Sequence, residues 1–129
     1  VTRGWATLGI AALKAFDPSN VGVVGPTFNE GNTAIMTHDM VHRTHLDIFK
    51  TYYPDVFSAW WIDDWITKVY EPGRSRKLKS WHVKHHIHRH GTRYNVQHHE
   101  AEHLKPRLDR DKGILNDWIG KHNTFHTEN

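Results

Sequence analysis

The sequence predicts an α/β fold in which a mixed sheet is flanked by helices. Short continuous apolar runs bounded by turn residues are typical of buried strands, and residues 21–26 form such a run. Other segments repeat apolar residues every three or four positions, which is the spacing of an amphipathic helix. At 129 residues, the chain has the length of a single domain.

The N-terminal half is expected to alternate helices with strands. A helix is predicted over residues 5–16, and the turn-forming segment 17–20 ends it. The apolar run 21–26 follows as a short strand, and its position after a helix favours a parallel strand covered on both faces. Residues 33–37 are predicted to form a second strand and residues 39–49 a second helix.

The middle of the chain is aromatic and then basic. Residues 52–62 are aromatic and irregular, and a short helix is expected to begin near the acidic pair at 63–64, because carboxylates favour the N-terminal end of a helix. Residues 74–79 are expected to be a basic linker. The partial alternation in residues 81–87 predicts a strand.

The C-terminal part is expected to hold one short helix. Residues 95–110 are polar and charged, and Pro106 interrupts them. A closing helix is predicted over residues 114–119, with Gly120 as its C-cap. Residues 120–129 are expected to form a flexible tail.

Composition excludes several classes of protein. The chain has no cysteine, which excludes a disulfide framework and a thiolate zinc site. No apolar run approaches the roughly 20 residues that cross a bilayer. A net charge of +3 is compatible with a phosphate-bearing ligand. The basic residues do not form the continuous stripe that nucleic acids require, so no nucleic-acid partner is expected.

The most informative feature is an acidic pair, Asp63 and Asp64, surrounded by Trp60, Trp61 and Trp65. Burial among aromatic rings raises the pKa of a carboxyl group, and a neighbouring carboxylate has the same effect. Such a carboxylate is suited to accept a proton from a hydroxyl group. The alternative interpretation is an ordinary N-cap of a surface helix.

A run of imidazoles follows about twenty residues later. It comprises His82, His85, His86, His88 and His90 among the chain's 13 histidines. On a strand, His85 would share one face with Val83 and Ile87, and the other histidines of the run would alternate on the opposite face. Neutral imidazole is a common metal ligand, whereas the alternative is a solvated strand edge. His38, His42 and His45 are assigned no role.

The order of these elements and motifs resembles the C-terminal, acceptor-binding half of a GT-A-type glycosyltransferase, a Rossmann-type domain of the nucleotide-diphospho-sugar transferase superfamily. Residues 57–66 resemble the family segment that carries the general base, and the resemblance covers roughly residues 4–119. It implies a nucleotide-binding half with an Asp-x-Asp motif before the acidic pair. Residues 109–111 have that spacing but follow the pair, so they are not expected to be this motif. Residues 1–129 are therefore expected to be a partial catalytic domain, inactive alone.

The resemblance also implies roles for individual residues. Asp64 would be the general base, and Asp63 would orient it or bind acceptor hydroxyls. A divalent metal ion, Mn²⁺ or Mg²⁺, would be bound by His85 or by its neighbour His86. One imidazole among oxygen ligands favours manganese.

The donor would be a nucleotide-sugar and the acceptor a glycan or another hydroxyl compound. Arg89 and Arg93 would clamp the donor diphosphate. Trp60 and Trp61 would bind the acceptor by stacking on a sugar ring, and Tyr52 and Tyr53 are further candidates for such stacking.

Two other classes stay open. A non-enzymatic, histidine-rich metal-binding domain would use the imidazoles of residues 82–90 and would bind zinc or nickel without a nucleotide. A histidine-based nuclease is a weaker alternative, because the order of elements does not predict the ββα unit that such nucleases use.

Overall fold

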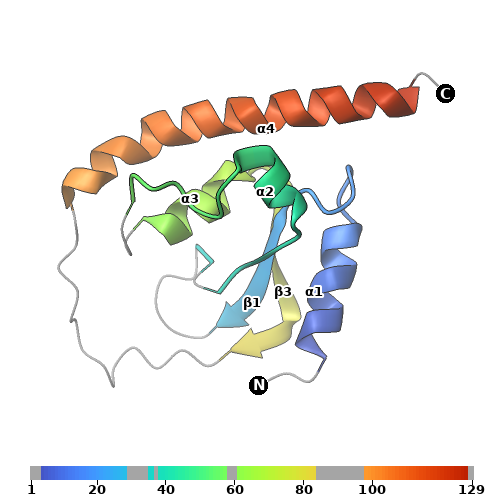
Figure 1. Ribbon diagram of the computed structural model, residues 1–129. Coiled ribbons are helices and arrows are strands. Elements are labelled where there is room, and N and C mark those ends of the chain that lie inside the picture. Colours follow the sequence, from blue (N-terminus) through green and yellow to red (C-terminus); the bar gives the residue numbers. More distant parts are fainter. Residues whose placement is uncertain (1–3, 29–34, 37, 58–60, 84–97, 128–129) are drawn as a thin grey trace.

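The computed structural model describes residues 4–28, 35–36, 38–57, 61–83 and 98–127 (Figure 1). These residues form a sheet with flanking helices, as the sequence predicts. In chain order the elements are α1 (Trp5–Lys14), β1 (Val23–Phe28), β2 (Met40–Val41), α2 (Thr44–Phe49), α3 (Ile62–Val69), β3 (Ser75–Val83), the 3-10 helix η2 (His98–His103) and α4 (Leu104–Thr127).

The sheet of the described residues has three strands in the order β2-β1-β3. The central strand β1 is antiparallel to β2 and parallel to β3, so the prediction of a parallel strand here is confirmed. Val23 and Val24 are both fully buried, which fits a strand covered on both faces. The pairing of β1 with β3 shifts between Pro26 and Thr27. Pro26 has no N–H group to donate to the ladder, which accounts for an irregularity at this point.

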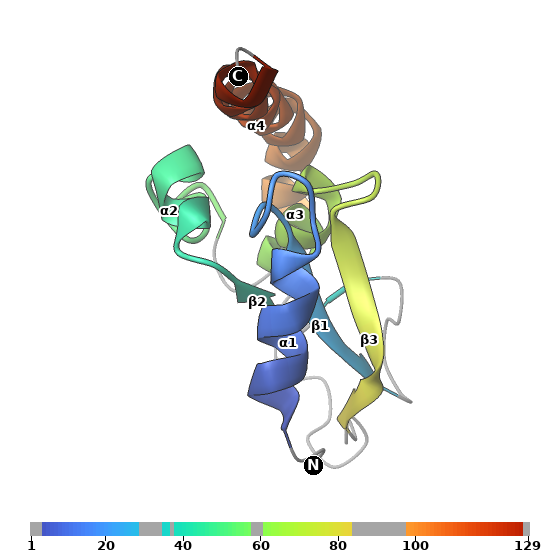
Figure 2. The same cartoon turned by 90° about the vertical axis from the view of Figure 1, so that its right-hand side faces the viewer.

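Helices cover the two faces of the sheet (Figures 1 and 2). On one face, Leu13 and Phe16 from α1 and the segment after it pack against Val24 of β1. On the other face, Val23 belongs to a larger core cluster that contains Trp65 and Ile66 of α3. Successive strand residues point to opposite faces, which explains why two adjacent valines lie in different clusters.

Helices α1 and α3 confirm two local predictions. The helix predicted over residues 5–16 is α1, and Lys14 is its last residue. The short helix expected at the acidic pair is α3. Both helices were recognisable from sequence because their signals lie within one or two turns of chain.

The segment before α2 differs from the prediction. The helix expected over residues 39–49 is divided into β2 and the shorter helix α2. Met40 and Val41 pair with Val24 and Val23 of β1, and this pairing replaces the helical conformation. Ile35 and Met36 of the predicted second strand are not in a strand, and residues 33, 34 and 37 lie outside the described residues.

The predicted linker over residues 74–79 is also wrong. Strand β3 begins at Ser75 and pairs with β1 from Val23 onwards. Pairing with a central strand outweighs the low strand propensity of a basic segment. Arg76 lies with its guanidinium carbon 5.5 Å from the centre of the Phe16 ring, so its charge stays at the surface above an aromatic face. Residues 84–87 of the predicted strand lie outside the described residues.

The C-terminal helix is far longer than predicted. Instead of ending at 119, α4 covers 24 residues and passes Gly120, so it includes residues 120–127 where a tail was expected. Pro106 does not interrupt it, because proline in the first turn loses no hydrogen bond that the helix would otherwise make. Figure 1 shows α4 lying across α3 and α2. No helix in the described part of the chain is both long and apolar enough to cross a membrane.

Candidate active site

The acidic pair lies in the first turn of α3. The N-cap position is occupied by Trp61, which has a left-handed backbone with φ of 75° and makes no capping hydrogen bond through its side chain. Asp63 and Asp64 follow inside the helix, so the interpretation of the pair as an N-cap is wrong. Their charges still interact favourably with the positive end of the helix dipole.

The two carboxyl groups have different surroundings. Burial raises the pKa of Asp63 to about 6, and the charges of Asp39 and Asp64 act in the same direction. Asp64 instead lies 3.8 Å from the Nζ atom of Lys68, one turn further along α3. A carboxyl group with a pKa near 6 is deprotonated at neutral pH and still basic enough to accept a proton in a reaction. Asp63 therefore has the properties expected of a general base.

A third carboxylate, Asp39, was not predicted as a site residue. The hydroxyl group of Tyr52 donates a hydrogen bond of 2.8 Å to its Oδ2 atom, and that of Tyr53 donates one of 2.9 Å to its Oδ1 atom. The two tyrosine rings lie 4.6 Å apart. Burial raises the pKa of Tyr53, followed by the charge of Asp39. Both hydroxyl groups thus stay protonated as donors. Only a polar segment before β2 marks Asp39 in the sequence, and such segments are common in loops.

Thr67 connects α3 to the segment that precedes Asp39. Its hydroxyl group donates a hydrogen bond of 2.7 Å to the carbonyl oxygen of Asp63. The Thr67 hydroxyl oxygen in turn accepts a hydrogen bond of 2.8 Å from the backbone N–H of Met36. Thr67 and Met36 are both buried. Buried hydrogen bonds of this kind fix the position of Met36 relative to the first turn of α3.

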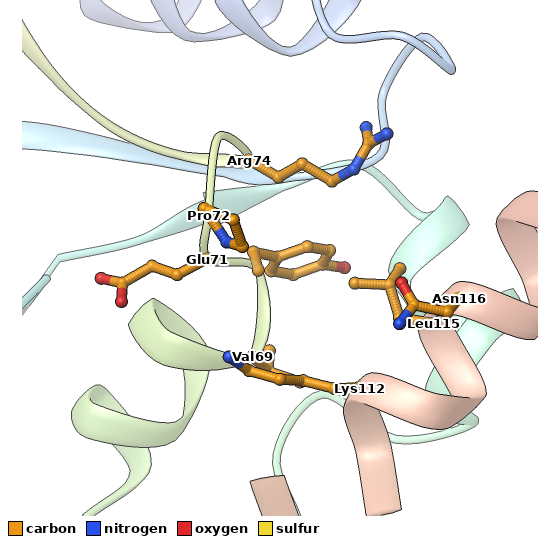
Figure 3. Close-up of a pocket in the computed structure, with 8 residues that line it drawn as sticks. Val69, Glu71, Pro72, Arg74, Lys112, Leu115 and Asn116 are labelled. Atoms are coloured by element: carbon orange, nitrogen blue, oxygen red, sulfur yellow. The ribbon is translucent and has the colours of Figure 1, made fainter. Parts of the chain in front are cut away.

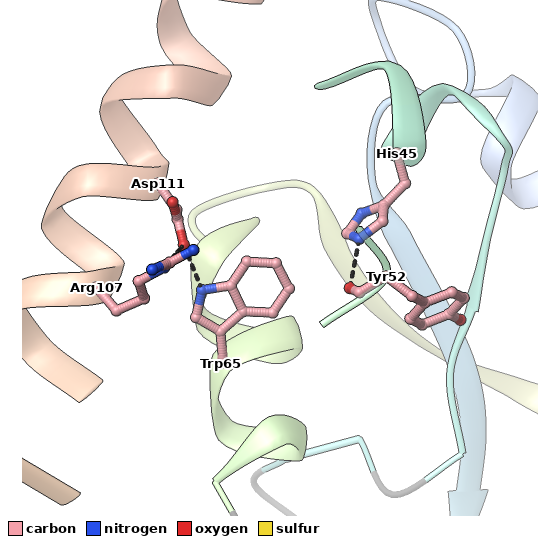
Figure 4. A network of polar contacts seen from close by, with 5 residues as sticks. All are labelled: His45, Tyr52, Trp65, Arg107 and Asp111. Atoms are coloured by element: carbon pink, nitrogen blue, oxygen red, sulfur yellow. Dashed lines mark hydrogen bonds and ion pairs between the residues drawn. The ribbon is translucent and has the colours of Figure 1, made fainter. Parts of the chain in front are cut away.

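The buried imidazole of His45 makes a hydrogen bond with the backbone of Tyr52 (Figure 4). Its Nε2 atom lies 2.7 Å from the carbonyl oxygen of Tyr52, and its Nδ1 atom lies 2.7 Å from the hydroxyl oxygen of Tyr70. Because a carbonyl can only accept, Nε2 carries the proton and Nδ1 accepts from Tyr70. Burial lowers the pKa of His45, although the bond to Tyr52 and the charge of Asp39 oppose this change. The imidazole is therefore a neutral structural connector.

A buried carboxylate joins α3 to α4, also drawn in Figure 4. The Oδ2 atom of Asp111 accepts hydrogen bonds of 3.0 Å from Nε1 of Trp65 and from Nε of Arg107. Asp109, by contrast, is exposed and pairs with Lys105. The carboxylate of Asp111 thus joins the two helices.

Several predicted site residues lie outside the described residues. These are the metal candidates His85 and His86, the diphosphate candidates Arg89 and Arg93, and the acceptor candidate Trp60. Trp61 is described and is partly buried. Within the described ranges, no group of three or more His, Asp or Glu residues could hold a metal ion.

Two cavities lie away from the acidic pair. One, of about 180 Å³, is bordered by Tyr70, Arg74, Lys112 and Asn116, between the turn that follows α3 and helix α4 (Figure 3). Arg74 donates hydrogen bonds to the carbonyl oxygens of Val21 and Asp17, so its guanidinium group is occupied by the backbone. The other cavity, of about 270 Å³, is bordered by Phe16, Asp17, Gly73 and Arg74. Neither is lined by a predicted site residue.

Comparisons with protein-family models, with curated proteins and with solved structures find no match to this chain.

Proposed function

We propose that this chain is the acceptor-binding half of a nucleotide-sugar-dependent glycosyltransferase, with the acidic pair of α3 as its proton acceptor. The single observation that carries the proposal is the Asp63 carboxyl group, whose pKa is raised to about 6 by burial and by two neighbouring carboxylates. The finer fold assignment, the C-terminal half of a GT-A-type domain, is part of the same proposal. The parallel pair β1 and β3 with α1 on one face is compatible with it.

The contacts favour Asp63 over Asp64 as the base. The resemblance alone implies Asp64, but Asp64 has a cation partner in Lys68. That ion pair engages the Asp64 carboxylate and leaves it less available to an acceptor hydroxyl group. In the proposed reaction, Asp63 takes the proton from the acceptor hydroxyl while the hydroxyl oxygen attacks the anomeric carbon of the donor. Asp64 then orients the acceptor through a hydrogen bond to another hydroxyl group.

The aromatic residues before α3 supply the acceptor surface in this proposal. Trp61 adjoins the first turn of the helix, and Trp60 precedes it in sequence. An indole ring offers a broad apolar face to the C–H bonds of a sugar ring. The acceptor is accordingly a glycan or another polyhydroxy compound.

The residues proposed to bind the donor lie outside the described residues. Arg89 and Arg93 would bind the diphosphate, and His85 or His86 would bind Mn²⁺ or Mg²⁺. The described carboxylates do not form a metal-binding group by themselves. When bound, a divalent ion neutralises negative charge on the leaving diphosphate. The proton transfer assigned to Asp63 does not depend on it.

The test compares two substitutions in the complete protein, with its nucleotide-binding half. Asp63→Asn is expected to lower the rate of transfer by about 100-fold or more while leaving donor affinity unchanged, because general-base catalysis contributes about that much. Asp64→Asn is expected to lower it less. Asp47→Asn, an exposed carboxylate on α2, is the matched control. Normal turnover by Asp63→Asn would refute the assignment.

A metal titration of residues 1–129 distinguishes the proposed glycosyltransferase half from the alternative, a histidine-rich metal-binding domain. A histidine-rich metal-binding domain would bind Zn²⁺ or Ni²⁺ tightly without any nucleotide, as measured by calorimetry. The proposed glycosyltransferase half would bind these ions weakly under the same conditions.

A further inference from the structure

The cavity of about 270 Å³ lies between the segment that follows α1 and the turn that precedes β3. Phe16 and Asp17 border it from the first segment, and Gly73, Arg74 and Arg76 border it from the turn and the start of β3. Figure 2 shows these two parts of the chain side by side. The size suits a small ligand, because pockets for larger ligands have volumes of roughly 300–1,000 Å³.

The backbone fixes the guanidinium group of Arg74 at this cavity. Its Nη1 atom donates a hydrogen bond of 3.2 Å to the carbonyl oxygen of Val21, and its Nη2 atom donates one of 2.6 Å to that of Asp17. Figure 3 shows that this guanidinium group points away from the Glu71 carboxylate. The two bonds use two of the five N–H groups of an arginine side chain, so three remain for a ligand. A cation whose position is already fixed loses less conformational entropy when it binds.

Arg76 brings a second positive charge to the same cavity. It follows Arg74 by two residues, the spacing that places strand residues on one face. Its guanidinium carbon lies 5.5 Å from the centre of the Phe16 ring. This contact positions the guanidinium group above an aromatic ring and uses none of its N–H groups as conventional hydrogen-bond donors.

Neither charge is neutralised by a carboxylate within the described ranges. Ion pairs join Lys68, Lys105 and Arg107 to aspartates one turn away on the same helix, but no such pair involves Arg74 or Arg76. A site with two fixed positive charges and no anion of its own favours a negatively charged ligand.

The rest of the lining leaves room for such a ligand. Gly73 has a φ of 87°, and a Cβ atom there would meet nothing within 4 Å. In the part of the chain that the structure describes, the backbone N–H of Gly73 makes no hydrogen bond. Asp17 is the acidic residue of the lining; it is exposed, and its backbone carbonyl is the group that binds Arg74. Two arginines and one aspartate give the lining a net positive charge.

We propose that this cavity binds a phosphate group, either free phosphate or the phosphate of a small compound, through the guanidinium groups of Arg74 and Arg76 and the backbone N–H of Gly73. A phosphate group carries a charge of about −1.5 to −2 at pH 7 and has several acceptor oxygens. Guanidinium groups match these oxygens with paired N–H donors. The inference does not rest on the proposed function, in which Arg89 and Arg93 bind the diphosphate.

The test is an NMR titration of residues 1–129 with inorganic phosphate, with chloride at equal ionic strength as the reference. The backbone amide resonance of Gly73 is expected to shift until the site is saturated. Arg76→Gln should weaken phosphate binding by about tenfold, because it removes a charged donor and leaves the backbone bonds of Arg74 in place. Arg110→Gln is the matched control: Arg110 is exposed on α4 and borders neither cavity, so this variant should bind like the wild type.

Two results would overturn the proposal. One is a Gly73 resonance that responds to phosphate no more than to chloride, and the other is equal phosphate affinity in the wild type and in Arg76→Gln. Asp17→Asn tests the same site in the opposite direction and should tighten binding, because it removes the negative charge from the lining. Unchanged or weaker binding by this variant would contradict the assigned position.

A titration with a phosphomonoester identifies the source of the phosphate group. Tighter binding of the ester assigns the site to a phosphorylated compound, whereas equal or tighter binding of inorganic phosphate assigns it to the free ion. Neither outcome bears on Asp63 as the proposed base, because Asp63 does not border this cavity.

Discussion

Replacing Asp63 by Asn should stabilise the folded chain at neutral pH. The folded pKa of Asp63 is about 6 against an ordinary value of 3.8, so folding disfavours its charged form. A difference of this size corresponds to at most about 3 kcal/mol. Because the side chain is only partly buried, solvent screening reduces the expected gain to about 1–2 kcal/mol. Asparagine has nearly the same shape and carries no charge to desolvate.

The sign of the pH dependence follows from the raised pKa. Below pH 3.8, Asp63 is protonated in both states and costs nothing. As the pH rises from about 3.8 to about 6, the unfolded state releases this proton while the folded state keeps it, so the folded state loses stability over this range. The gain from Asp63→Asn should therefore be absent near pH 3.5 and complete near pH 7.5.

Urea denaturation followed by tryptophan fluorescence measures this gain. Unfolding free energies of the wild type and of Asp63→Asn should be compared at several pH values between 3.5 and 7.5. Asp64→Asn is the matched control, and it should lose about 0.2–0.5 kcal/mol at neutral pH because its helix ion pair with Lys68 is removed. An Asp63→Asn variant that is neutral or less stable at pH 7.5 would show that burial of this carboxylate is not costly.

Two further predictions concern the buried polar groups. Asp111→Ala should cost about 3 kcal/mol in urea denaturation, because it leaves Arg107 and the Trp65 indole N–H without their shared acceptor, whereas Asp109→Ala should change stability by about 0.5 kcal/mol or less. Equal costs for the two would contradict the packing role of Asp111. The lowered pKa of His45 predicts that stability present above its ordinary value of 6.5 is lost as the pH falls through the folded pKa. A His45→Leu variant should lose this acid dependence, and at pH 7.5 it should be less stable by about 2 kcal/mol because the Tyr52 carbonyl loses its donor.

Local signals in the sequence were sufficient for part of the fold. The apolar spacing of α1, the turn after it and the apolar run of β1 each lie within about ten residues. Strand β2 and residues 75–80 of β3 were missed because their formation depends on pairing with β1, far away in sequence. The length of α4 was missed because Pro106 was interpreted as a break, although it lies in the first turn.

The candidate site, like the fold, was predictable from the sequence only in part. Asp63 and Asp64 are adjacent in sequence and stand out among tryptophans, so their position on a short helix was predictable. The raised pKa of Asp63 was not predictable, because it arises from burial by the rest of the fold and then from the charge of Asp39, on another element. The sequence does not indicate Asp39 as a site residue, because its hydrogen bonds with Tyr52 and Tyr53 form only in the folded chain.

The bond between Asp111 and Trp65 determines how α4 can lie on the rest of the molecule. Apolar side chains such as Leu108 and Leu115 would tolerate sliding of the helix by one turn, about 5.4 Å, because each would contact another apolar side chain after the shift. A carboxylate that must meet one indole N–H allows no such freedom. The helix therefore has a single register, chosen by one polar contact within an otherwise permissive surface.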